Sequence, residues 1–225
     1  EEHVYSGCAR VNGSGELLLV YTSVKKGTRE DRPNNEQWAA RPLDAELVTW
    51  ERHPANPVLA LDTHGGPAFH GEWRDPFIFS ADGRNFLVIA GDTDETLEVA
   101  LYEAVDDSLV RWRYCGPLVQ EPRDERRRFL ECPNFVQIPP SEPGGKAKWI
   151  LLTSPYSCVE YTTGTFDLHT LAFTPEQHGI LDAGQNDVPN FYATNFVDDT
   201  DGNCVLLGWA RGFEKGRGWN GALAL

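Results

Sequence analysis

The amino-acid sequence predicts an all-β protein built as a β-propeller, on three observations. No window of about 11–18 residues places apolar residues at the spacing of an amphipathic helix. Short apolar runs bounded by turn residues recur along the whole chain instead. These runs come in groups of about four, and a repeat of four short strands is typical of a propeller blade.

The predicted strands follow one another in order and are separated by turn sequences such as Ala81-Asp82-Gly83-Arg84. Each run is short enough for a strand and too short for a typical helix. The clearest runs lie at residues 17–22, 77–79, 86–90, 97–102, 149–153 and 204–209. Trp50, Trp112 and Phe173 mark the last run of three groups.

The groups begin at Ser6, Asp75, Glu131 and Tyr192, which are 69, 56 and 61 residues apart. In a propeller the first strand of each blade lines the central channel, so residues at the same place in successive blades meet at one end of it. We therefore expect Asp75 and Glu131 to lie together. Because propellers close about 4–8 blades into a ring, we interpret residues 1–225 as one partial propeller domain of about four blades.

The composition of the chain limits the classes of molecule that it is expected to bind. The chain has 225 residues, with 20 Lys and Arg against 34 Asp and Glu, a formal net charge of −14 at pH 7. This acidic balance argues against nucleic acid or an anionic membrane as partner, because phosphate groups bind basic surfaces. A neutral substrate is compatible with it. No apolar run approaches the roughly 20 residues of a spanning helix. The pI of about 4.8 fits a secreted protein but leaves the compartment open.

Cysteine and histidine give no sign of a metal site. The five cysteines are scattered without a Cys-x-x-Cys pair, so we expect neither a zinc ribbon nor a dense disulfide framework. The six histidines show no helical metal spacing. We expect no metal and no other cofactor. One sequon, Asn12-Gly13-Ser14, would permit glycosylation if the protein were secreted from a eukaryote.

Asp75 and Glu131 are the candidate catalytic residues, since each opens a predicted blade and is followed closely by proline. Hydrolysis of a glycosidic bond needs two carboxyl groups, one that gives a proton and one that stabilises or attacks the sugar cation. We expect Arg74 to keep Asp75 ionised, and Cys132 to modulate the proton affinity of the neighbouring Glu131. Taken alone, both segments also fit ordinary proline-containing turns between strands.

Six short segments stand out, in order along nearly the whole chain: Tyr5-Ser6-Gly7-Cys8-Ala9, Asn56-Pro57-Val58, Trp73-Arg74-Asp75-Pro76, Glu131-Cys132-Pro133, Phe191-Tyr192-Ala193 and Gly208-Trp209. Together they resemble glycoside hydrolase family 32, the invertase, inulinase and levanase family. The resemblance implies a five-bladed propeller catalytic domain, usually followed by a β-sandwich. It also implies hydrolysis of β-fructofuranosides such as sucrose, inulin or levan with retention of configuration.

The resemblance assigns a role to each matched residue. Glu131 would be the general acid/base, and Asp75 would be the transition-state stabiliser that holds fructose hydroxyls. The residues expected to bind the sugar or line its pocket are Arg74, Ser6, Tyr192, Trp209 and Trp73.

Departures from the family pattern bear on activity. Cys8 stands where the family usually has Ser, and Asn190 stands where Asp often precedes Phe-Tyr-Ala. The family's nucleophile is an Asp in a Trp-x-Asn-Asp-Pro-Asn-Gly-like segment upstream of Ser-Gly, and the sequence contains no such segment. We therefore expect residues 1–225 to lack the first blade and the C-terminal β-sandwich, and to be inactive alone because no covalent intermediate can form.

Three other functions fit parts of the pattern. A fructosyltransferase, in which a sugar instead of water resolves the intermediate, would have the same segments. A non-catalytic carbohydrate-binding propeller remnant would bind sugar without turnover. A propeller glycosidase acting on arabinan fits the fold but explains Glu131-Cys132-Pro133 and Phe191-Tyr192-Ala193 poorly.

Overall fold

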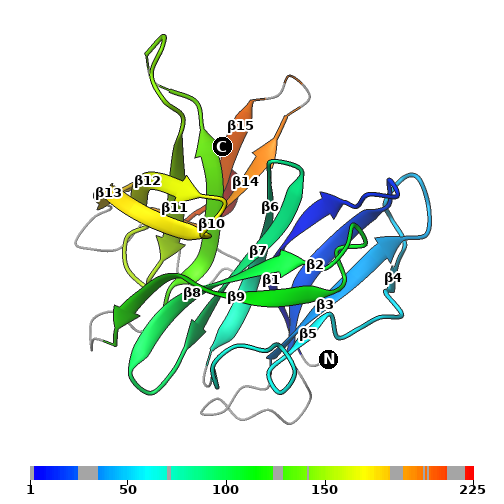
Figure 1. Ribbon diagram of the computed structural model, residues 1–225. Coiled ribbons are helices and arrows are strands. Elements are labelled where there is room, and N and C mark those ends of the chain that lie inside the picture. The colour runs from blue at the N-terminus through cyan, green and yellow to red at the C-terminus, as the bar shows by residue number, and fades with distance from the viewer. Residues whose placement is uncertain are drawn as a thin grey trace, which may run out of the picture. The chain divides into compact units, whose positions relative to one another are not determined.

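The computed structural model describes residues 3–24, 35–69, 72–123, 129–140, 142–182, 190–199, 201, 203–211 and 221–225. Within these residues the regular secondary structure is entirely β-strand, as the sequence predicts (Figure 1). The strands form four antiparallel sheets, in which strands adjacent in the chain pair with one another, except that the short strand Leu59–Ala60 pairs with Asn35–Pro42. This meander is the topology of a propeller blade.

The chain divides into two compact units, Glu1–Phe129 and Leu130–Leu225, and each unit contains two sheets. The sheets of the first unit consist of β1 (His3–Val11), β2 (Leu17–Val24), β3 (Asn35–Pro42), β4 (Trp50–Arg52) and β5 (Leu59–Ala60), and of β6 (Trp73–Ala81), β7 (Arg84–Asp92), β8 (Thr96–Ala104) and β9 (Trp112–Pro122). The sheets of the second unit consist of β10 (Glu131–Ile138), β11 (Lys148–Ser154), β12 (Glu160–Asp167) and β13 (Ala172–Ile180), and of β14 (Phe191–Asp198), β15 (Cys204–Ala210) and β16 (Ala222–Ala224).

One apolar cluster holds the two sheets of the first unit together. Strand β6 packs against β1, β2 and β3, and side chains such as Val20, Trp73 and Leu87 are fully buried between the sheets. Burial of a side chain of this size stabilises the fold by about 1.5–3 kcal/mol. The same packing encloses Cys8, whose sulfur accepts the Ile78 N–H at 3.3 Å. Burial raises the pKa of Cys8 to about 11, so the thiol stays protonated.

The first strand of every sheet carries a β-bulge near its start. In β6, β10 and β14 the bulge follows Arg74, Glu131 and Tyr192, and the next residue adopts a left-handed backbone conformation. These next residues are Asp75 (φ 65°), Cys132 (φ 49°) and Ala193 (φ 50°). In β1 the shift in register falls between Tyr5 and Gly7, which leaves Ser6 as the extra residue. In β6 and β10 the bulge also contains a proline, Pro76 and Pro133, which has no N–H to donate to a ladder.

The positions of the bulges show which residues of the four sheets are structurally equivalent, and this changes the alignment of the repeats that the sequence predicted. The equivalent positions are Tyr5, Arg74, Glu131 and Tyr192, which are 69, 57 and 61 residues apart. Asp75 therefore corresponds to Cys132, and the prediction that Asp75 and Glu131 occupy the same place in their blades is wrong by one residue. Sequence spacing alone did not locate the extra residue of each bulge.

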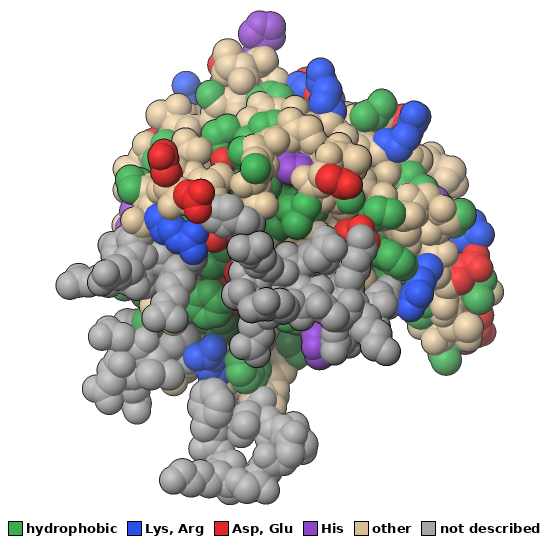
Figure 2. Space-filling view, turned by 90° about the horizontal axis from the view of Figure 1, so that it is seen from below, with side chains coloured by type: hydrophobic (Ala, Val, Ile, Leu, Met, Phe, Trp, Pro, Cys, Tyr) green, Lys and Arg blue, Asp and Glu red, His purple; other side chains and the backbone are tan. Residues whose placement is uncertain are grey.

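The structure also bears on the cysteines, the glycosylation sequon and the surface charge discussed above. All five cysteines lie in the described part of the chain, and none of them forms a disulfide there. Asn12 of the sequon is only 8% exposed, and its side-chain oxygen accepts the backbone N–H groups of Ser14 and Glu16. On the face that Figure 2 shows, acidic and basic side chains of the described residues are scattered and do not form a basic patch. Among the described residues no helix is long and apolar enough to cross a membrane.

We predict that Ala193→Gly stabilises the protein by about 0.5–1 kcal/mol. A left-handed alanine costs about 1–2 kcal/mol, and glycine removes this cost. The larger conformational entropy of glycine in the unfolded chain cancels only part of the gain in stability. Ala100→Gly is the matched control, because Ala100 is a buried strand residue without a positive φ, and it should lose about 1 kcal/mol. The measurement is urea unfolding. Equal losses in both variants would contradict a left-handed backbone at Ala193.

Candidate active site

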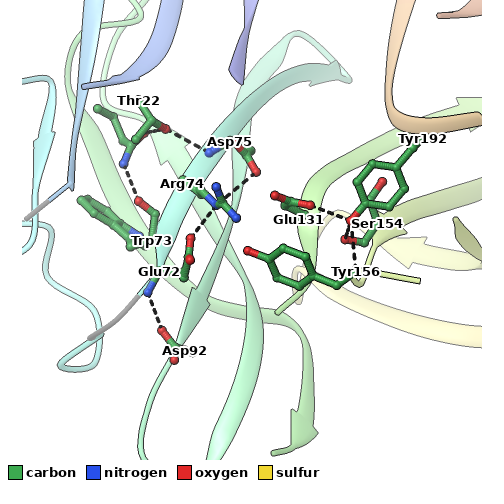
Figure 3. Close-up of polar contacts among 11 residues, drawn as sticks. Thr22, Glu72, Trp73, Arg74, Asp75, Asp92, Glu131, Ser154, Tyr156 and Tyr192 are labelled. Atoms are coloured by element: carbon green, nitrogen blue, oxygen red, sulfur yellow. Dashed lines mark hydrogen bonds and ion pairs between the residues drawn. The ribbon is translucent and has the colours of Figure 1, made fainter. Parts of the chain in front are cut away.

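In the first unit, two buried polar side chains of the neighbouring sheet bind the backbone at and next to Asp75 (Figure 3). The Asp75 backbone N–H donates to Thr22 Oγ1 at 3.0 Å, and that hydroxyl donates to Gln37 Oε1 at 2.6 Å. Gln37 Nε2 in turn donates to the Trp73 carbonyl at 3.2 Å. Because Asp75 is 4% exposed, its backbone N–H needs such a partner. This network fixes the bulge of β6 in place.

Arg74 lies between two aromatic rings and two carboxylates. Its guanidinium carbon is 5.2 Å from the ring centroids of both Tyr5 and Phe129. Arg74 Nε is 2.8 Å from Glu72 Oε2 and 3.8 Å from Asp75 Oδ2. The bulge places Arg74 and Asp75 near each other, so the guanidinium lies close to both carboxylates. Arg74 is thus shared by two carboxylates, with Glu72 the nearer, where the sequence predicted Asp75 alone.

In the second unit, Glu131 is bound by a buried tyrosine. The Tyr192 hydroxyl lies 2.6 Å from Glu131 Oε2 and 2.9 Å from the Ser154 carbonyl oxygen. The backbone N–H of Tyr156 donates to the same hydroxyl oxygen at 3.0 Å (Figure 3). Burial, followed by the Glu131 carboxylate, raises the pKa of Tyr192 well above its ordinary value, so its hydroxyl keeps its hydrogen.

This arrangement suits a carboxyl group that gains and loses a proton. A tyrosine hydroxyl has one hydrogen and two lone pairs. When Glu131 is ionised, the Tyr192 hydrogen points to the carboxylate. When Glu131 is protonated, it donates to Tyr192, whose hydrogen turns to the Ser154 carbonyl. The Tyr156 N–H is accepted in both cases, so every polar group of the network has a partner in either state.

Arg211 stacks on the two aromatic residues predicted to line the site. Its guanidinium carbon is 4.4 Å from the Tyr192 ring centroid and 4.8 Å from the Trp209 ring centroid. The Arg211 backbone N–H donates to the Asn190 carbonyl at 2.8 Å, which holds the Arg211 backbone beside the start of β14. A cation in contact with two rings contributes about 0.5–2 kcal/mol. Tyr192 and Trp209 are paired across β14 and β15.

The remaining predicted residues lie in different settings. Trp73 is 1% exposed and packs against His64 and Phe69 in the core, so it supports Arg74 and Asp75 from within. Ser6 is exposed at the bulge of β1. Cys132 is buried in the left-handed position after Glu131. Contact of these side chains with a sugar, and an effect of Cys132 on Glu131, stay predictions.

Sequence reasoning missed the residues that support the predicted ones. They are Thr22, Gln37, Glu72, Ser154, Tyr156 and Arg211. None of them stands in a recognisable motif, because each acts through a contact that only the folded chain creates. Asp75 and Glu131 belong to different units, and the expectation that they meet stays a prediction. Within the described part of the chain, no group of three or more His, Cys, Asp and Glu side chains is arranged to hold a metal ion.

Comparison with known proteins gives a consistent result. The sequence model described as "Glycosyl hydrolases family 32 N-terminal domain" matches residues 1–225. An extracellular exo-inulinase of Aspergillus awamori is 26% identical over 95% of the chain and 44% of its own length. An acid beta-fructofuranosidase of Phaseolus vulgaris is 26% identical over 93% of the chain and 33% of its own length. The chain therefore spans less than half of these relatives.

Solved structures confirm the predicted propeller fold class. A family 32 beta-fructofuranosidase of Bombyx mori, solved as a mutant in complex with sucrose, matches 99% of this chain and 47% of its own, with a TM-score of 0.76 and 26% identity. Fructan 1-exohydrolase IIa of Cichorium intybus matches 98% of this chain and 43% of its own, with a TM-score of 0.77 and 23% identity. The second likeness concerns the fold alone.

We predict that Thr22→Val lowers the free energy of unfolding by about 1–3 kcal/mol. The change keeps the side-chain shape but leaves the Asp75 N–H and Gln37 Oε1 buried without their shared partner. Thr162→Val should change stability by less than about 0.5 kcal/mol, because that hydroxyl contacts His178 at an exposed position. Urea unfolding measures both, and equal effects would show that the Thr22 network does not hold β6.

Proposed function

Because the chain belongs to glycoside hydrolase family 32, we propose that the protein containing it hydrolyses β-fructofuranosidic bonds in sucrose or in fructans such as inulin and levan. The reaction is a retaining double displacement. Glu131 is the general acid/base, Asp75 stabilises the transition state, and the attacking carboxylate comes from a segment outside residues 1–225. The substrate is a neutral sugar or oligosaccharide, in keeping with the acidic chain.

The hydrogen-bond network around Glu131 is the observation that carries this proposal. A general acid/base must be stable in both protonation states, and the Tyr192 hydroxyl and Ser154 carbonyl supply matching partners for both. The names of the relatives support the substrate class, since they describe an exo-inulinase, a fructan 1-exohydrolase and an acid beta-fructofuranosidase.

In the first step, the attacking carboxylate forms a bond to the anomeric carbon of the fructosyl unit. The bond from that carbon to the glycosidic oxygen breaks, and the leaving oxygen takes the proton of Glu131. The positive charge that develops on the sugar ring is stabilised by the ionised Asp75, which Arg74 keeps in that form.

In the second step, water attacks the same carbon and gives its proton to the Glu131 carboxylate. The bond to the attacking carboxylate breaks, and fructose leaves with its original configuration. The Tyr192 hydrogen then returns to the position it had before the first step. Arg74, Ser6, Trp209 and Tyr192 contribute to binding of the fructosyl unit, and Trp73 supports Arg74 from the core, since its side chain is buried.

We predict that Glu131→Gln in the complete protein lowers kcat on sucrose about 10²–10⁴-fold. The amide cannot give the proton that a sugar leaving group requires. The first step with p-nitrophenyl β-fructofuranoside should be affected far less, because nitrophenolate leaves without a proton. Azide, which attacks without a base, should then restore turnover of that substrate.

Glu176→Gln is the control for Glu131→Gln, because Glu176 is a glutamate on β13 that pairs with Lys148 at the surface. It should leave all rates unchanged. Absence of fructose release from sucrose, inulin and levan by the unchanged complete protein would overturn the proposed function. Oligosaccharide products in concentrated sucrose would identify a transferase.

We predict that Tyr192→Phe lowers kcat on sucrose about 10–100-fold, since a hydrogen bond to an ionised group is worth about 1.5–3 kcal/mol. The loss on p-nitrophenyl β-fructofuranoside should again be smaller. Tyr161→Phe, a change of the same kind on β12, should leave both rates unchanged. Equal losses of Tyr192→Phe on the two substrates would show that Tyr192 shapes the site without assisting Glu131.

A further inference from the structure

Glu72 is the nearer of two carboxylates that lie beside Arg74. Arg74 Nε is 2.8 Å from Glu72 Oε2 and 3.8 Å from Asp75 Oδ2. In Figure 3 the dashed lines from Arg74 run to Glu72 on one side and to Asp75 on another. A separation of 2.8 Å is within hydrogen-bonding distance, whereas 3.8 Å lies beyond it. Arg74 therefore pairs closely with Glu72 and only at longer range with Asp75.

A buried carboxylate fixes the backbone from which the Glu72 side chain projects. Asp92, at the end of β7, is 2% exposed, and its Oδ1 accepts the Glu72 N–H at 3.1 Å. Asp92 Oδ2 lies 2.9 Å from Arg123 Nη1. A hydrogen bond to a carboxylate is stronger than one between neutral groups. The contact lies directly before the first paired residues of β6 and β7, so it extends their ladder by one position and holds Glu72 beside Arg74.

Two aromatic rings limit the movement of the Arg74 guanidinium. Its central carbon is 5.2 Å from the ring centroids of Tyr5 and of Phe129, and the Arg74 side chain is only 11% exposed. Both contacts are attractive for a cation. The backbone of Asp75 is fixed as well, by its hydrogen bond to Thr22. Because both partners are restricted, the separation between Arg74 and Asp75 depends on the attraction that Glu72 exerts from the other side.

The charge balance around Arg74 matters for the proposed reaction, because a positive charge develops on the fructosyl ring. Asp75 offers a negative charge to that ring, and a guanidinium in direct contact with Asp75 would cancel much of it. Arg74 carries one positive charge, whereas Glu72 and Asp75 carry one negative charge each. The three side chains together are therefore negative, and they would be neutral without the Glu72 carboxylate.

We infer that Glu72 is a positioning residue, which draws the Arg74 guanidinium away from Asp75 and so leaves the Asp75 charge available to the developing sugar cation. This inference deepens the proposed function and rests on it. Glu72 acts through Arg74, so its role requires no contact with the sugar. The site then favours a five-membered sugar ring that carries a positive charge over a neutral ring of the same shape.

The test measures binding of two compounds to the complete protein. Anhydromannitol reproduces the ring and the hydroxyl groups of fructofuranose and is neutral, whereas iminomannitol has a protonated ring nitrogen in place of the ring oxygen. Glu72→Gln removes the charge and keeps the shape of the side chain. It should raise the Kd of iminomannitol about 3–10-fold, change the Kd of anhydromannitol by less than about 2-fold, and lower kcat for fructose release about 3–10-fold. Glu72→Asp keeps the charge and should retain most of the preference for iminomannitol.

Glu51→Gln is the matched control, because Glu51 also belongs to the first unit, is exposed to a similar extent (40% against 38% for Glu72) and pairs with Arg41 at 2.6 Å. It should leave both dissociation constants and kcat unchanged. Equal weakening of both compounds by Glu72→Gln, an unchanged Kd of iminomannitol, or an unchanged kcat would overturn the inference and leave the proposed function standing. Absence of turnover of sucrose, inulin and levan by the unchanged protein would overturn the proposed function and the inference with it.

Discussion

The β-bulge at the start of each first strand is the constraint on which the rest of the structure depends. One extra residue in β6, β10 and β14 forces a left-handed conformation at Asp75, Cys132 and Ala193. The bulge interrupts the ladder and redirects the side chains on either side of it. As a result Arg74, Glu131 and Tyr192 occupy equivalent positions in three blades, so three of the residues proposed for the active site lie at the same kind of backbone irregularity.

Each bulge needs support, because it leaves backbone groups without ladder partners. In the first unit the support is polar and buried, since Thr22 and Gln37 of one sheet bind the backbone of Trp73 and Asp75 in the next. In the second unit the Tyr192 hydroxyl has the corresponding role and binds the Tyr156 backbone as well as Glu131. The groups that support the strained backbone thus lie against the residues proposed for catalysis, so we expect their substitution to affect both stability and the proposed activity.

Much of the fold was predictable because its signals are local. The apolar runs at residues 86–90 and 97–102 became β7 and β8, and turn sequences such as Ala81-Asp82-Gly83-Arg84 separate strands as expected. Motif resemblance also identified the family, and the family model agrees with it. The roles of Asp75, Glu131 and Tyr192 stay predictions. The repeat alignment was wrong by one residue at Asp75, because an extra residue in a strand has no distinct signature in composition or periodicity.

The sequence by itself determined the all-β class, the blade repeat and the family, since strand periodicity, turn residues and short motifs are properties of neighbouring residues. Only the tertiary structure decided which side chains act together. The contacts of Tyr192 with Glu131 and of Thr22 with Asp75 join residues that are 61 and 53 positions apart. Such partners are chosen by the packing of one sheet against another, and no local pattern encodes that choice.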